Sequence, residues 1–272
     1  MTITDRDYNI LTDEEKVEWN LQEHLASLDD NGKPFLIKGM KRTNYTLIPK
    51  AARHYLSLFP NNMMDICDLK RDDYLHDMVN GFEKFLDDPS TGELQILNYI
   101  NHGMRHHLIA SILKGGYDFG HHEAFVFPEF KLGNSWTVDY LIVGRNSGGY
   151  EFIFVELESN KGQVTRKDGE FSTVINKGIH QINDWKIWLE GRYSQLNETF
   201  EKYLHVDKSL PDEFRTYDSS RIHYVCVAGR RTDYNKATYT RRRKFMQEQR
   251  INVMHYDNLI DLARNTIGKA TY

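Results

Sequence analysis

The stretch YEFIFVELE, residues 150–158, constrains the fold more than any other part of the chain. Side chains alternate along a strand, so Phe152, Phe154 and Glu156 share one face, and the residues between them share the other. Both faces are apolar until Glu156, which is typical of a central strand covered on both sides. The chain must therefore bury this strand between two layers, and Glu156 and Glu158 lie where it leaves the core.

The sequence after residue 92 predicts alternating helices and strands. The helices are expected at 93–113, 171–190, 240–250 and 257–267, and the strands at 125–132, 136–144, 150–158, 221–229 and 251–256. Apolar residues at helical spacing, as in 171–190, and short apolar runs between turn signals give these assignments. The order predicts an α/β domain with a mixed β-sheet flanked by helices.

Residues 1–90 are expected to form a smaller, mainly helical N-terminal module with a regulatory or sensing role. Thr12 and Glu15 have the spacing of a capping box that opens a helix. Further helices are predicted at 48–58 and 72–88, and a short strand at 34–39. The turn sequence at 88–92 marks the boundary, so the second domain is expected at 91–272.

Composition excludes several classes of protein. No apolar run is long enough to span a membrane, and the N-terminus has neither the basic start nor the apolar core of a signal peptide. Cys67 and Cys226 have no CxxC spacing, so we expect buried thiols in a reducing cytosol. The net charge of −4 excludes a globally basic nucleic-acid binder but not a local basic patch.

A hairpin between the second and third strands would bring carboxylates together. If residues 146–149 form the loop, Asp139 faces Glu156, with Cβ atoms about 4.5–5.5 Å apart. Two like charges this close repel, and a hard divalent cation resolves the conflict. Oxygen ligands favour Mg²⁺ or Mn²⁺ over zinc. The alternative is that these acids simply meet water at the strand ends.

These residues resemble a known group of enzymes. Asp139, followed after a hairpin by Glu156-Leu157-Glu158 and then by a helix with Gln181, resembles the PD-(D/E)XK nuclease superfamily. More narrowly, the segments 125–143, 154–158, 180–190, 227–231 and 241–262 are similar to the Shedu anti-phage defence nucleases, over about residues 93–265. The resemblance implies a restriction-endonuclease-like fold and a Mg²⁺-dependent endonuclease or nickase that acts on DNA in bacterial defence.

The resemblance also implies roles for single residues. Asp139 and Glu156 match the metal-binding carboxylates, and Glu129 in the preceding strand is expected to be an auxiliary acid. Gln181 matches a downstream helix glutamine found in several branches of the superfamily.

One position departs from the family pattern. The third motif residue is usually lysine, but here it is Glu158, which would orient or deprotonate the attacking water or bind a second ion. Lys161 is expected to stabilise the phosphate, and either Lys161 or Lys177 could supply the missing positive charge.

A basic segment runs through residues 230–244, which carry seven basic residues and one acid. We expect phosphate contacts from Arg230, Arg231, Arg241, Arg242, Arg243 and Lys244, together with Lys177. The alternative is a solvated helix face. His102 and His106 have a spacing that can chelate zinc on a helix, but no HExxH pattern accompanies them, which favours polar surface positions.

The predicted function is a cytoplasmic deoxyribonuclease that works as a homodimer or homotetramer. The alternative is a nuclease fold that has lost catalysis and only binds nucleic-acid ends or a partner protein. The departure at Glu158 favours the alternative, whereas the retention of Asp139 and Glu156 favours the enzyme.

Overall fold

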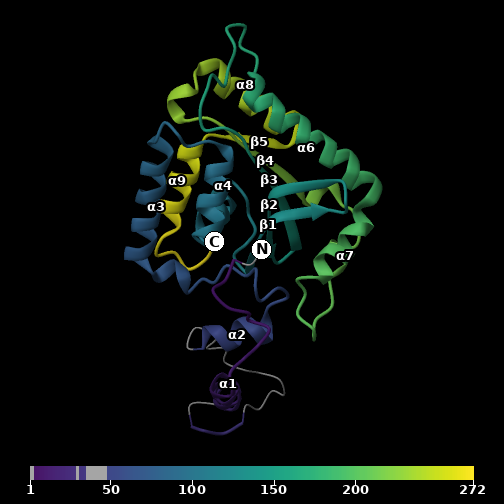
Figure 1. Cartoon of the computed structure of the whole chain (residues 1–272). Helices are drawn as coiled ribbons and strands as arrows, with labels where there is room; N and C mark the ends of the chain where they lie inside the picture. The colour runs from purple at the N-terminus through teal and green to yellow at the C-terminus, as the bar shows by residue number, and fades with distance from the viewer. Residues whose placement is uncertain (1–2, 29–30, 35–47) are drawn as a thin grey trace.

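The computed structural model describes residues 3–28, 31–34 and 48–272. Within them, five strands form one mixed sheet in the order β1-β2-β3-β4-β5, with helices on both of its sides (Figure 1). The predicted α/β class with a mixed sheet flanked by helices is therefore confirmed. The narrower restriction-endonuclease-like fold stays a prediction.

The strands follow the predicted order closely. They are β1 (Glu123–Leu132), β2 (Trp136–Asn146), β3 (Gly149–Leu157), β4 (Ile222–Val227) and β5 (Ile251–Met254). The first three form an antiparallel meander, and β4 and β5 join β3 as parallel strands. The strand predicted at 34–39 lies almost wholly outside the described residues.

The described helices also match the expected segments, except that the helix at residues 196–201 was not predicted and the helix expected at 93–113 is interrupted. They are α1 (Asp13–Ala26), α2 (Pro49–Leu56), α3 (Asp72–Asp87), α4 (Glu93–His102), α5 (His107–Ala110), α6 (Thr173–Arg192), α7 (Leu196–Glu201), α8 (Lys236–Gln249) and α9 (Tyr256–Thr266). The capping box of α1 is present, because Thr12 Oγ1 accepts a hydrogen bond from the Glu15 amide and Glu15 accepts one from the Thr12 amide. None of these helices has the length and apolar character needed to span a bilayer.

The single long helix predicted at 93–113 is wrong. The structure ends α4 at His102, and Met104 has a φ of 50°, a left-handed conformation through which no α-helix continues. The chain resumes as the short α5 and a 3-10 turn. His102 and His106 therefore do not share a helix face.

The hairpin register confirms the pairing inferred from the sequence. Val143 pairs with Phe152, and the last pair toward the open end is Tyr140 with Val155. Asp139 lies one residue beyond Tyr140 toward that open end, and Glu156 lies one residue beyond Val155. The same register therefore places Asp139 opposite Glu156.

The sheet separates two hydrophobic clusters. Phe152 and Phe154 pack with α6 and α7, whereas Ile153 and Val155 pack with α3, α4 and α9 on the opposite face. Figure 1 shows this arrangement, with α3, α4 and α9 on one side of the sheet and α6 and α7 on the other. The two-sided burial predicted for this strand is confirmed.

Helix α3 belongs to the same core as the sheet. Its residues Leu75, Val79, Phe82 and Leu86 are buried in the cluster that contains Ile153. A boundary at residue 90 would therefore divide one hydrophobic core, although the independence of an N-terminal module stays a prediction.

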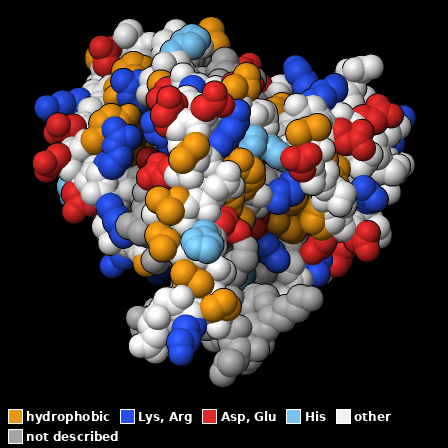
Figure 2. Space-filling model, turned by 90° about the horizontal axis from the view of Figure 1, so that it is seen from below, with side chains coloured by type: hydrophobic (Ala, Val, Ile, Leu, Met, Phe, Trp, Pro, Cys, Tyr) orange, Lys and Arg blue, Asp and Glu red, His pale blue; other side chains and the backbone are white. Residues whose placement is uncertain are grey.

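Helices α1 and α2 lie below this body (Figure 1). Helix α1 buries no residue, and Val17, Leu21 and Leu25 on it are 68%, 54% and 50% exposed. Seen from below, the surface mixes apolar side chains with charges of both signs (Figure 2).

Candidate acidic site

The end of β3 carries two buried glutamates. Glu156 and Glu158 are each 2% exposed, and one carboxylate oxygen of each, Glu156 Oε2 and Glu158 Oε1, has no hydrogen-bond partner. The backbone of Glu158 is held on both sides, since its amide donates to Val227 O and its carbonyl accepts from the Tyr256 hydroxyl. The sheet thus fixes two carboxylates whose unpartnered oxygens are buried away from water.

Asp139 joins them from β2. Its Oδ2 accepts a hydrogen bond of 2.7 Å from the Leu157 amide, so a side chain replaces the strand-to-strand bond at this point. Burial raises the pKa of Asp139 above its usual range, while this hydrogen bond lowers it in part. Burial also raises the pKa of Glu156, and repulsion from Asp139 and Glu158 adds to that rise. The predicted crowding of carboxylates is therefore present.

A fourth carboxylate was not predicted from the sequence. Glu93 is the first residue of α4, and its negative charge raises the pKa values of Asp139 and Glu156. No sequence motif includes it, because it lies 46 residues before Asp139 in the chain. The only signal was an acid in the first turn of a predicted helix, which is common for reasons of helix capping and dipole alone.

Lys177 of α6 bridges this cluster. Its Nζ donates to Glu158 Oε2 at 3.0 Å and to Glu93 Oε2 at 3.1 Å. Burial raises the pKa of Glu158 to about 6, and the hydrogen bond from Lys177 limits the rise. Of the two lysines considered from the sequence, Lys177 is the one that the fold brings to the glutamates.

Lys161 is directed elsewhere. Its Nζ donates to the carbonyl oxygens of Asp88 and Pro89, in the connection between α3 and α4. The structure therefore does not bring Lys161 to the carboxylate of Glu158.

Two other predicted site residues lie nearby. Gln181 is partly buried on α6, one turn after Lys177 and on the same side of the helix. Glu129 falls opposite Asp139 in the register of β1 and β2, but it has a φ of 49° and its side chain is exposed. A left-handed glutamate in a strand is strained, and such strain is common at functional sites.

The cluster contains the right atoms for a hard cation but is not arranged around one. Across the described residues, no set of three or more His, Cys, Asp and Glu side chains is placed as a metal site. Glu158 and Glu93 each accept a hydrogen bond from Lys177, and Asp139 accepts one from the Leu157 amide. The unpartnered oxygens of Glu156 and Glu158 fit a divalent cation, since an oxygen-only donor set suits Mg²⁺ or Mn²⁺.

The predicted phosphate-binding residues differ in whether an acidic side chain already neutralises their positive charge. Arg230 pairs with Asp257 and Asp87, Arg231 with Asp261, and Arg241 with Glu170. These pairs reduce the positive potential that a phosphate would meet.

The rest of α8 is less neutralised. Arg242 is partly buried and lies within 3.5 Å of Asn252 and Asn258, whereas Arg243 contacts only the Thr240 hydroxyl among the described residues. Lys244, with Lys236 and Arg241, lines a shallow groove of about 700 Å³ along α8. Of the cations in this groove, Arg241 already pairs with Glu170.

Comparison with known proteins gives one family. The family model described as "Shedu protein SduA, C-terminal" matches residues 93–260, which include the acidic cluster, α6 and α8. A search of curated proteins gives no match.

Proposed function

We propose that this chain, which belongs to the family of Shedu protein SduA through its C-terminal part, is a metal-dependent DNA nuclease that acts in defence against phage. The observation that carries the proposal is the cluster of Asp139, Glu156 and Glu158, in which two buried glutamates each keep an oxygen without a partner. Family membership supports the defence role, and the cluster supports the chemistry.

Asp139 and Glu156 would hold the cation, and Glu93 could contribute from the start of α4. A bound Mg²⁺ would neutralise the carboxylates and supply Lewis-acid stabilisation to a phosphodiester. The repulsion that raises the pKa of Glu156 supports this assignment, because a divalent cation would turn an unfavourable group of negative charges into a favourable one.

Glu158 and Lys177 would act on the reacting groups. A carboxylate with a pKa of about 6 is suited to accept a proton from water near neutral pH. The Lys177 ammonium group, 3.0 Å from Glu158, keeps that carboxylate ionised and brings positive charge to the place where a phosphate would bind. Lys177 would thus take the role of the lysine that the motif usually carries two positions after Glu156.

The direct test is incubation of purified protein with linear and with circular DNA, in Mg²⁺ or in EDTA. Cleavage is expected only with the cation and only with the carboxylates intact, so Asp139→Asn and Glu156→Gln should both be inactive. Glu198→Gln, an exposed acid on α7, is the matched control and should cleave like the wild type. Equal cleavage by all variants, in protein free of contaminating nuclease, would disprove the site.

A second candidate is a nuclease fold that binds DNA ends or a partner without cutting. The bridge from Lys177 to Glu93 and Glu158 favours it, because that bridge already neutralises part of the cluster. Calorimetric titration separates the two functions: the enzyme should bind Mn²⁺ and lose that binding in Glu156→Gln, whereas the binding module should show no heat in either protein.

The predicted homodimer or homotetramer is also a proposal, since family enzymes of this kind generally act as oligomers. Light scattering coupled to size exclusion would measure the assembly directly. A monomer at all concentrations that support DNA cleavage would contradict it.

A further inference from the structure

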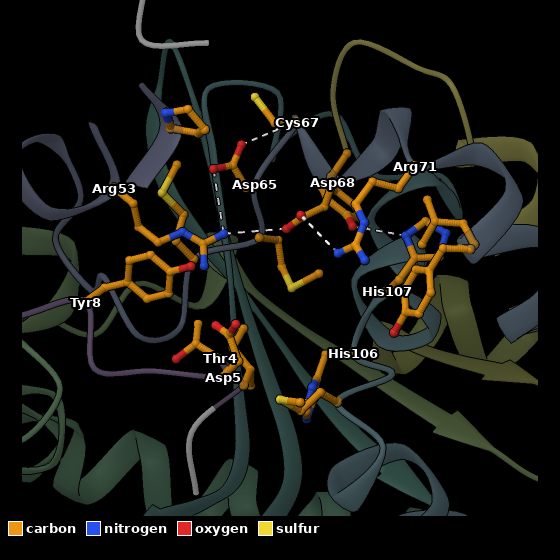
Figure 3. Close-up of a pocket in the computed structure, with 18 of the residues that line it drawn as sticks. Thr4, Asp5, Tyr8, Arg53, Asp65, Cys67, Asp68, Arg71, His106 and His107 are labelled. Atoms are coloured by element: carbon orange, nitrogen blue, oxygen red, sulfur yellow. Dashed lines mark hydrogen bonds and ion pairs between the residues drawn. The ribbon is translucent and has the colours of Figure 1, made fainter. Parts of the chain in front are cut away.

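A second pocket lies between the N-terminal segment and the body of the molecule, apart from the acidic cluster. Its volume is about 460 Å³, within the range of sites for small ligands. The lining comes from the segment around Tyr8, from α2, from the turn that holds Asp65 and Asp68, from α3 and from the chain after α4. Figure 3 shows these side chains converging on the cavity.

Two arginines, Arg53 and Arg71, approach Asp68 from different sides at the edge of this pocket (Figure 3). Arg53 is 7% exposed and approaches Asp65 and Asp68 at 3.6 and 3.5 Å, distances too long for hydrogen bonds. Arg71 approaches Asp68 at 3.9 Å. Among the described residues neither guanidinium donates a hydrogen bond. Each lies over a tyrosine ring, Arg53 over Tyr8 at 4.6 Å and Arg71 over Tyr74 at 4.4 Å, a contact that leaves the in-plane N–H groups able to bind an anion.

Asp68 is a loose partner for these arginines. Burial raises its pKa above the usual range, and its side chain is 46% exposed, so it can turn outward. A phosphate would accept two parallel hydrogen bonds from each guanidinium fork, which a carboxylate at these distances does not. The lining also holds Lys50 and Asp5. With Asp68 turned outward, the cations Lys50, Arg53 and Arg71 outnumber Asp5 and Asp65, so an anion can bind.

His106 marks the other end of the pocket. It is 2% exposed, and neither of its ring nitrogens has a hydrogen-bond partner in the part of the chain that the structure describes. Burial lowers its pKa to about 4, so at neutral pH the ring has one donor and one acceptor. A buried polar group left without partners is costly. Because the two ring nitrogens point to different sides of the imidazole, one donor or acceptor on a ligand would satisfy one of them.

The walls between these ends suit a flat ring. They include the thioethers Met63, Met64, Met78 and Met104, whereas Tyr8 and Tyr74 lie against the two guanidiniums. Thioethers adapt to ring faces and make favourable sulfur contacts with them. An anion site, an apolar slot and an unpartnered imidazole therefore follow one another along one cavity.

We propose that this pocket binds a small molecule that joins a phosphate to a hydrogen-bonding ring, of the class of a nucleoside monophosphate. The phosphate binds Arg53 and Arg71, the ring lies among the methionines, and one polar atom on its edge bonds a ring nitrogen of His106. This proposal does not depend on the nuclease activity, because none of the residues belongs to the acidic cluster.

Binding is measured by calorimetry and by thermal shift with AMP, GMP, CMP and UMP, in EDTA. Inorganic phosphate and the four nucleosides serve as partial ligands. At least one monophosphate should bind and raise Tm, and each partial ligand should bind at least about tenfold more weakly. The nucleosides lack the charged hydrogen bonds to the arginines, and inorganic phosphate lacks the contacts of the ring.

Two variants place the binding in this pocket. Arg71→Gln, at a position 59% exposed, and His106→Phe should each weaken binding about tenfold or more, whereas the exposed Arg215→Gln should not change it. Near-UV circular dichroism checks that each variant is folded, and Arg71→Gln decides the result if His106→Phe is not.

Three results would overturn the proposal. They are no binding by any monophosphate at millimolar concentration, equal binding by inorganic phosphate alone, and binding that Arg71→Gln leaves unchanged. The last result would place the nucleotide elsewhere, for example at the acidic cluster.

Discussion

Glu156 is the residue whose surroundings are least favourable for a charge. It is buried, it has an oxygen without a partner, and Asp139 and Glu158 repel it. Such a side chain lowers stability unless something neutralises it, so its presence in a core strand indicates a role other than folding.

Replacing Glu156 by Gln should stabilise the cation-free protein at pH 8 and abolish cleavage. The pKa of this carboxyl is higher in the folded protein than in the unfolded chain, where it is about 4. The carboxyl therefore does not lower the free energy of unfolding below about pH 4, and it lowers that free energy as the pH rises through the folded-state pKa. The variant's gain in Tm should therefore be several degrees at pH 8 in EDTA and should shrink toward pH 4. Thermal melts across this range measure it, and a gain that grows toward acid pH would contradict the assignment.

Lys177 and Lys161 are competing candidates for the missing motif lysine, and a pair of variants separates them. Lys177→Gln removes the cation from Glu158, so the pKa of Glu158 should rise by about 1 unit or more. Activity at pH 7 should fall about 100-fold, with the acid limb of the rate profile moved to higher pH. Lys161→Gln should keep both the rate and the profile; the reverse result would restore Lys161 as the catalytic lysine.

At the scale of elements, α6 must approach the sheet closely to deliver Lys177. Gly178 makes this possible, because a Cβ there would lie 2.8 Å from Cys226 Sγ and 3.1 Å from Glu158 Cγ. The neighbouring Lys177 then reaches Glu158 from the same turn of the helix. The position of α6 on β4 therefore sets the geometry of the site.

Gly178→Ala should destabilise the protein by about 1–3 kcal/mol, although alanine is the better helix former, because the added methyl overpacks the contact. Gly191→Ala in the same helix is the control. Nothing lies within 4 Å of its added Cβ, so it should stabilise by about 0.5–1 kcal/mol. Urea unfolding measures both, and a stabilised Gly178→Ala would show that α6 does not pack this tightly.

At the scale of the whole molecule, residues before 91 contribute both to the hydrophobic core under the sheet and to the lining of the second pocket. Helix α3 completes the core beneath the sheet, and α2 with the N-terminal segment lines the second pocket. The N-terminal part is therefore joined to the rest by packing, not only by a linker.

A fragment of residues 91–272 should lose its fixed tertiary structure, because it lacks Val79, Phe82 and Leu86 of the shared core. A fragment of residues 58–272 keeps α3 and should stay folded. Near-UV circular dichroism and dye binding to exposed apolar surface compare the two. A folded 91–272 fragment would support the division predicted from the sequence.

DNA binding should depend on the unpaired basic residues more than on the paired ones. Changing Arg243 and Lys244 to Ala should weaken binding irrespective of sequence and reduce the slope of log K against log salt by up to about 0.9 per contact. Changing Arg230 and Arg231, which already pair with acids, should alter the slope less. Equal slopes in all proteins would place the DNA elsewhere.

Local sequence patterns predicted the strands, their order along the chain, the hairpin register and the meeting of Asp139 with Glu156. These follow from local alternation of side chains and from a short turn, which act over neighbouring residues. It could not decide between Lys161 and Lys177 or point to Glu93, because their distances to Glu158 depend on how α4 and α6 pack on the sheet. It also predicted a continuous helix at 93–113, where the left-handed Met104 ends it. Only the tertiary structure formed the pocket of Arg53 and His106, since its walls come from segments far apart in the chain.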